Sequence, residues 1–214
     1  MRSACAPPWP HARTSHGLDI GGWRTIARSR AFVALTVATA LGAFAMFAAT
    51  IHLVPMLTWR GLTPTAAAWA LGLSGAGQLL GRIAYGPLAA RTTPPVRASL
   101  LLAASGLTIA AVGLLAGPPL TLIAAAVALG VARGAFTLLQ STAISDRWGS
   151  SSYGVLFGIL NAPTTLAMAL APWAAAAFTS ATGSYPATFA VLAATACLAA
   201  LIALTTGVHR SNAA

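Results

Sequence analysis

The stretch AFVALTVATALGAFAMFAATIHLVPMLT, residues 31–58, decides the fold because it contains no Asp, Glu, Lys or Arg. A helix needs about 20 mostly apolar residues to cross the hydrocarbon core of a bilayer. Further long apolar stretches follow at residues 65–89, 98–116, 119–141, 153–178 and 186–208. The sequence therefore predicts an all-α membrane protein with six transmembrane helices.

The composition of the whole chain also indicates a membrane protein. The chain has 214 residues, of which 57% are hydrophobic and only 14 are charged, 12 basic and 2 acidic. A soluble domain carries about 25% charged residues, so this chain lacks the polar surface that a water-soluble globule needs. We expect the lipid bilayer to be its main partner.

The twelve basic residues are all arginines, and they give a net charge of +10. A nucleic-acid interface needs a clustered basic face in polar surroundings. These arginines instead lie mostly between apolar runs, so we expect no nucleic-acid partner. Cytoplasmic loops of membrane proteins carry an excess of Lys and Arg. The charges therefore predict the topology of the chain.

With the N-terminus placed in the cytoplasm, Arg60 is the one arginine in an outside segment. The inside segments then hold nine: Arg2, Arg13, Arg24, Arg28, Arg30, Arg91, Arg97, Arg147 and Arg210. We predict that both termini are cytoplasmic and that the protein lies in the plasma membrane. The expected organisation is an Arg- and Pro-rich tail at 1–30, a six-helix domain at 31–208 and a short tail at 209–214.

Strongly polar side chains inside a membrane usually face a bundle interior or a cavity. The predicted spans hold six of them: His52, Gln78, Arg82, Arg133, Gln140 and Asn161. Because these residues fall in spans one, two, four and five, we expect those spans to line a cavity and spans three and six to be supports. Thr137 and Gln140 share a helix face with Arg133, which favours a polar stripe facing an anion.

Structural alternatives exist for two of these residues. Arg133 can pair with backbone carbonyls and fix helix packing, and His52 can be a satisfied structural histidine. No span contains Asp or Glu, so proton coupling through this chain would depend on His52.

Three spans contain a GxxxG pattern, at Gly77–Gly81, Gly130–Gly134 and Gly154–Gly158. Small residues one turn apart let helix backbones approach closely, so we interpret these patterns as packing signals.

No enzyme chemistry is predicted. Gly72-Leu73-Ser74-Gly75 resembles the GxSG of rhomboid-type proteases, but the only later histidine, His209, falls in the tail. Two cysteines, Cys5 and Cys197, cannot form a metal site alone, and we expect neither a metal nor a cofactor.

Several short motifs occur in a fixed order along residues 24–208. They are Arg30-Ala31-Phe32, His52-Leu53-Val54-Pro55-Met56-Leu57, Arg60-Gly61-Leu62-Thr63-Pro64, Gly81-Arg82-Ile83-Ala84-Tyr85-Gly86-Pro87-Leu88-Ala89-Ala90-Arg91, Asp146-Arg147-Trp148-Gly149, Tyr153-Gly154, Ala171-Pro172 and Gly183-Ser184-Tyr185. In type and order they resemble the C-terminal six-helix half of bacterial major facilitator superfamily transporters. The resemblance implies a secondary transporter of the inner membrane that moves a small solute by alternating access.

The resemblance also implies roles for individual residues. Residues 81–91 resemble the eighth helix and the signature loop G-x-L-x-D-R, in which Ala90 replaces the family's Asp. Gln78, Arg82 and Gly86 are similar to the D-x-x-x-R-x-x-x-G of monocarboxylate porters, where the Arg binds the substrate carboxylate. A small organic anion is then the expected substrate.

The loops that match the family's gate contain Arg91, Asp146 and Arg147. Family members have two six-helix halves with the site between them. We therefore expect a second half as partner, either another chain or a second copy. The alternative is a truncated, non-transporting membrane protein or an interaction module.

Overall fold

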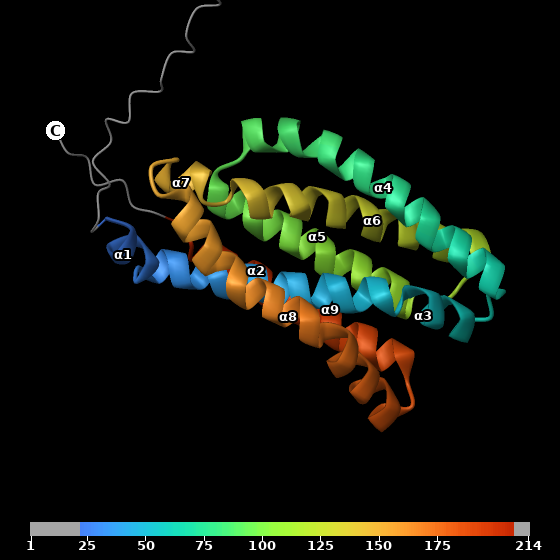
Figure 1. Cartoon of the computed structure of the whole chain (residues 1–214). Coiled ribbons are helices and arrows are strands. Elements are labelled where there is room, and N and C mark those ends of the chain that lie inside the picture. Colours follow the sequence, from blue (N-terminus) through green and yellow to red (C-terminus); the bar gives the residue numbers. More distant parts are fainter. Residues whose placement is uncertain (1–21, 208–214) are drawn as a thin grey trace, which may run out of the picture.

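The computed structural model describes residues 22–207, in which every regular element is a helix (Figure 1). Tail residues 1–21 and 208–214, including Cys5, His209 and Arg210, lie outside the described part, and the predicted tails stay a prediction. The elements are α1 (Gly22–Ala27), α2 (Arg30–Ile51), α3 (Leu53–Trp59), α4 (Pro64–Arg91), α5 (Pro94–Leu114), α6 (Pro119–Thr142), α7 (Ser145–Trp148), α8 (Tyr153–Thr182) and α9 (Tyr185–Leu204).

Five helices are long and apolar enough to cross a membrane, namely α2, α5, α6, α8 and α9. They match five of the six predicted spans. The remaining span, residues 65–89, is α4, which has 28 residues and is therefore long enough. Gln78, Arg82 and several glycines lower its hydropathy below that of the other five. Its crossing of the membrane stays a prediction.

The first predicted span is not one uninterrupted helix. Regular α-helix ends at Ile51 and resumes at Leu53, with His52 between α2 and α3. Pro55 explains the break, because it has no N–H to donate to the carbonyl of Ile51 one turn earlier. The helical path continues nevertheless, since the His52 N–H bonds the Ala48 carbonyl at 3.0 Å.

The helices pack in an order that differs from their order in the chain. The two most extensive contacts join α5 to α9 and α4 to α6, while α2 packs against both α8 and α9. The buried core is dominated by alanine and leucine, with Phe32 and Phe189 among its largest fully buried side chains. The abundance of alanine allows close packing between helix backbones.

Glycines of α4 and α6 interlock at their contact. A Cβ at Gly81 would overlap the Val131 carbonyl, and a Cβ at Gly130 would overlap that of Ser74. A Cβ at Gly77 or Gly134 would likewise overlap the backbone of the facing helix. Two of the three GxxxG patterns therefore pack against each other, which confirms them as packing signals, although the sequence did not indicate the partner.

The third GxxxG pattern, on α8, behaves differently. Nothing in the described residues lies within 4 Å of a Cβ built at Gly154 or Gly158. Within residues 22–207 this pattern packs against no other helix, so its role as a packing signal stays a prediction.

Apart from Arg82 and Arg133 inside the helices, the described arginines lie at the two ends of the bundle. One end holds α1, α7 and the turn from α4 to α5 (Figure 1). It carries Arg24, Arg28, Arg30, Arg91, Arg97 and Arg147. The opposite end holds α3 and carries Arg60, whose guanidinium donates to the Gly113 carbonyl. The described part of the chain therefore has one strongly basic end, the pattern expected for a membrane protein with a cytoplasmic face.

Candidate functional site

A polar cavity of about 290 Å³ lies between α2, α4, α6 and α8. These helices come from the four spans in which the sequence places charged or amide side chains. The lining residues are Ala43, Met46, Phe47, Gln78, Arg82, Arg133, Phe136, Thr137, Gln140 and Met168. Four of the six predicted site residues, Gln78, Arg82, Arg133 and Gln140, therefore come together in one place.

Arg133 is half-buried in the middle of α6. Its guanidinium lies 5.9 Å from the ring centre of Phe47, a cation–π arrangement that holds the charge against α2. Within residues 22–207 the guanidinium makes no hydrogen bond and no ion pair, so pairing with backbone carbonyls is not seen there. Thr137 donates to the Arg133 carbonyl at 3.0 Å, one turn along the same face. The N–H groups of Arg133 are therefore available to a ligand in the cavity.

Arg82 contributes the second positive charge, from α4. Gln78 precedes it by one turn, so both side chains share a helix face. Arg82 is exposed to the cavity, whereas Gln78 is half-buried. The described residues contain one acidic side chain, Asp146, and it is absent from the lining. The cavity therefore holds two cations without a neutralising acid, which favours binding of an anion.

His52 and Asn161 are not among the lining residues. His52 is 8% exposed, and its Nδ1 lies 3.1 Å from the Ala48 carbonyl oxygen, within its own helix. Asn161 is half-buried on α8, seven residues before Met168, which does line the cavity. Because residues seven apart share a helix face, Asn161 lies on the cavity side of α8, displaced toward the α7 end.

The sequence analysis missed the apolar part of this site. Phe47, Phe136 and Met168 line the cavity beside the arginines. They follow no pattern that separates them from ordinary core residues. Of the three, only Phe47 makes a specific contact, the cation–π contact with Arg133. The sequence does not show which helix faces Arg133, so this contact could not be predicted.

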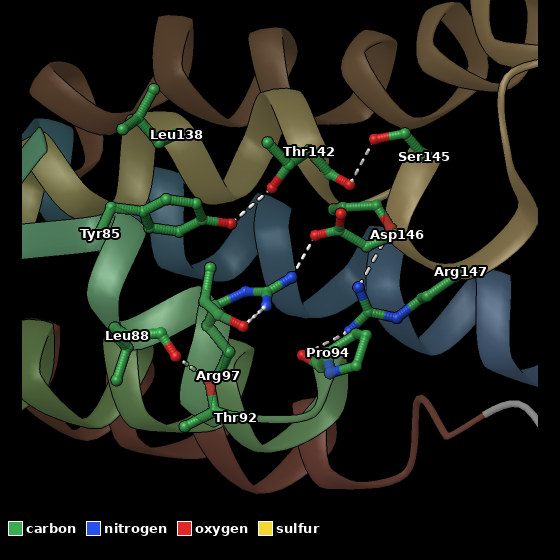
Figure 2. Close-up of polar contacts among 12 residues, drawn as sticks. Tyr85, Leu88, Thr92, Pro94, Arg97, Leu138, Thr142, Ser145, Asp146 and Arg147 are labelled. Atoms are coloured by element: carbon green, nitrogen blue, oxygen red, sulfur yellow. Dashed lines mark hydrogen bonds and ion pairs between the residues drawn. The ribbon is translucent and has the colours of Figure 1, made fainter.

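A second polar cluster lies at the basic end of the bundle (Figure 2). Arg97 of α5 forms an ion pair with Asp146 of α7, and donates to the Ala89 carbonyl at 3.3 Å. Its guanidinium also lies 5.5 Å from the ring centre of Tyr85, whose hydroxyl bonds the Thr142 hydroxyl. Arg97 is 4% exposed, so this is a buried charge with a partly exposed partner. The pair fixes α7 to the start of α5.

Arg147 extends this cluster toward the last helix. It donates to the Ala143 and Pro94 carbonyls and to the Thr206 hydroxyl, each at 3.0 Å. Burial and the charge of Arg97 lower the pKa of Arg147, Asp146 and Tyr85 raise it, and the net pKa is about 10. Arg147 thus joins the end of α6, the α4–α5 turn and the end of α9.

The predicted gate residues are only partly brought together. Asp146 and Arg147 belong to the cluster, but Arg91 is exposed and has no polar contact within residues 22–207. Arg97, which the sequence analysis treated only as a topology charge, is the partner of Asp146. Its 49-residue separation from Asp146 leaves no local signal of the pairing.

The polar cavity between four helices and the basic end are consistent with a membrane transporter, and comparison with known families shows the family of the chain. Residues 33–213 match the sequence profile of the Major Facilitator Superfamily. The chain belongs to the major facilitator superfamily. No curated protein matches the chain. Membership in this superfamily, with five apolar helices of spanning length, makes the chain a multi-pass integral membrane protein of a transporter family.

Proposed function

We propose that this major facilitator protein is a secondary transporter for a small organic anion. The observation that carries the proposal is the presence of Arg82 and Arg133 at one cavity that has no acidic side chain. An Arg fork matches a carboxylate, and hydrogen bonds from charged donors are about twice as strong as neutral ones. Gln78 and Gln140 add neutral donors beside the two charges, and Asn161 can join them if α8 shifts.

The proposed mechanism is alternating access. The solute binds in the cavity, and the bundle then rocks so that the cavity opens to the other side of the membrane. The cluster of Asp146 and Arg147 lies at the basic end, which we assign to the cytoplasm. There it holds α7 against α5 and α9, which favours a gate at that end. Arg91 borders the same end from α4.

We further propose that a second six-helix half completes the transporter and that this chain supplies the C-terminal half. Exposed apolar side chains on α4 and α8 support this. Ile83 is 73% exposed and Trp173 is 72% exposed, and α8 is the least buried of the five apolar helices. Halves of this superfamily are related by an axis along the membrane normal, so a second copy in the same orientation satisfies the geometry.

Uptake measurements test the proposal. The chain alone and a tandem fusion of two copies are reconstituted into separate liposomes, and uptake of radiolabelled lactate, benzoate and succinate is followed. We expect saturable uptake that Arg133→Gln removes in whichever preparation transports. Uptake by the fusion alone would support a half-transporter. If neither preparation takes up or binds any of these anions, the proposal is wrong and a non-transporting role remains.

A further inference from the structure

A second hollow of about 370 Å³ lies on other faces of α4 and α6, between these helices and α5. It is partly open to the outside of the bundle. Its lining is formed by small and apolar residues of the three helices: Gly81, Ala84, Tyr85, Leu88, Leu101, Ala104, Thr108, Ala128, Val131, Ala132 and Ala135. We call this hollow the apolar crevice.

The crevice exists because α4 and α5 barely touch, although they are consecutive in the chain. Each packs mainly on another helix, α4 on α6 and α5 on α9. The lining between them is rich in alanine, which is too small to fill the gap. The crevice therefore results from the way these helices pack.

The two hydroxyl groups of the lining are already occupied. Thr108 donates to carbonyls of its own helix, at 2.9 Å to Ala104 and 3.0 Å to Ser105. The Tyr85 hydroxyl bonds that of Thr142. Water needs two to four polar partners in a cavity, and the crevice does not offer them. A hydrocarbon chain is the occupant that this lining suits.

An arginine without a polar partner in residues 22–207 lies on the same face of α4 as two residues that line the crevice. Ala84, Leu88 and Arg91 lie at positions i, i+4 and i+7 of α4 and so share one face. Ala84 and Leu88 line the crevice, and Arg91 follows them at the basic end of the bundle, exposed and without a polar partner in residues 22–207. The neighbouring Arg97 is already paired with Asp146. An apolar slot followed by a free cation is complementary to an amphiphile with an anionic head.

We propose that the apolar crevice binds one acyl chain of an anionic phospholipid, with the phosphate at Arg91. The lipid belongs to the leaflet at the basic end of the bundle. It fills the space between α4 and α5 and so supports α4, the long helix of lowest hydropathy. This site is separate from the polar cavity, which lies on other faces of α4 and α6.

Photocrosslinking of the purified full chain tests the proposal. The probes are phosphatidylglycerol and phosphatidylcholine that carry the same diazirine-labelled acyl chain, and the labelled peptides are mapped by mass spectrometry. We expect phosphatidylglycerol to label α4, α5 and α6 at the crevice residues more than the exposed lipid-facing residues. Uniform labelling over all exposed apolar residues, with no enrichment at the crevice, would overturn the proposal.

Two pairs of variants sharpen this test. Ala104→Trp fills the crevice and should remove its labelling, whereas Leu107→Trp, on the same helix but 69% exposed and outside the lining, should not. Arg91→Gln should reduce the preference for the anionic over the neutral lipid by about fivefold, the effect of one arginine near a membrane surface. Arg28→Gln, at the same end but away from the crevice, should leave the crevice preference unchanged. Because Arg91 is exposed, its variant folds normally, and an unchanged preference in Arg91→Gln would overturn the headgroup assignment.

Discussion

Arg97 and Asp146 form an ion pair that joins the first turn of α5 to the short helix α7 (Figure 2). Arg97 is almost fully buried, and Asp146 is the one acidic side chain in residues 22–207. No other carboxylate in that part of the chain can replace it. Besides burial, the charge of the neighbouring Arg97 lowers the pKa of Arg147, and the charge of Asp146 raises it. Asp146 therefore offsets part of the repulsion between the two arginines.

Replacing Asp146 should destabilise this end of the bundle. We expect Asp146→Asn to lower the free energy of unfolding by about 3 kcal/mol, because a buried arginine loses its counter-charge. Urea unfolding in detergent, followed by circular dichroism, measures this. Arg28→Gln is the matched control, since Arg28 is exposed at the same end of the bundle and should change stability by less than about 0.5 kcal/mol. Equal effects of the two substitutions would show that the ion pair does not stabilise the fold.

The glycine contact between α4 and α6 predicts opposite effects of the same substitution at two positions of α4. A Cβ at Gly81 meets the backbone of α6, so Gly81→Ala should force the helices apart and cost about 2 kcal/mol. Gly75 has open space around it, and Gly75→Ala should be neutral or stabilising by up to about 1 kcal/mol, the helix preference of alanine. Thermal unfolding of both variants checks the difference. If Gly81→Ala proves as stable as Gly75→Ala, the close packing of α4 on α6 is wrong.

His52 should act on stability and not on transport. It is buried, bonds the Ala48 carbonyl and is absent from the cavity lining. We expect His52→Phe to keep the volume of the side chain and to cost about 1 kcal/mol, the net contribution of one hydrogen bond. Uptake per folded molecule should not change. A variant of normal stability that has lost uptake would instead place His52 in the transport mechanism.

The two arginines of the cavity should contribute unequally to anion affinity. Arg133 is half-buried, so Arg133→Gln should weaken binding by about 2 kcal/mol, or roughly thirtyfold. Arg82 is exposed, so solvent screens its charge, and Arg82→Gln should cost less than about 1 kcal/mol, or fivefold. Equilibrium binding of labelled benzoate to both variants gives the two ratios. A larger loss at Arg82 than at Arg133 would place the anion on α4.

The sequence allowed part of the site to be predicted and left part of it hidden, for physical reasons. Helix periodicity places Arg133, Thr137 and Gln140 on one face of α6. Because polar groups are costly in lipid, this face is expected to point into the bundle. Tertiary packing decides which helix lies opposite this face, so the contact between Arg133 and Phe47 has no signal in the sequence. Membership in the major facilitator superfamily is confirmed over residues 33–213, while the likeness to its C-terminal half and to monocarboxylate porters stays a prediction.

Long-range pairing was equally hidden. The sequence analysis assigned Arg97 to the topology signal and Asp146 to a gate. It did not pair them, because nothing local in the sequence connects α5 to α7. The GxxxG patterns showed the same limit: they indicated close packing but not the partner, and the pattern at Gly154–Gly158 contacts no other helix among the described residues. Pro55 was visible in the sequence, and its missing donor interrupts the helix at His52.

Equilibrium binding of labelled carboxylates to the reconstituted chain tests the central claim most directly. The claim is that the cavity lined by Arg82 and Arg133 holds a small organic anion. We predict saturable binding of at least one of lactate, benzoate and succinate, competed by unlabelled anion and not by benzamide, and weakened roughly thirtyfold by Arg133→Gln. Arg30→Gln, at the start of α2 and away from the cavity, should bind as the native chain does. Absence of saturable binding, or binding that Arg133→Gln leaves unchanged, would contradict the account.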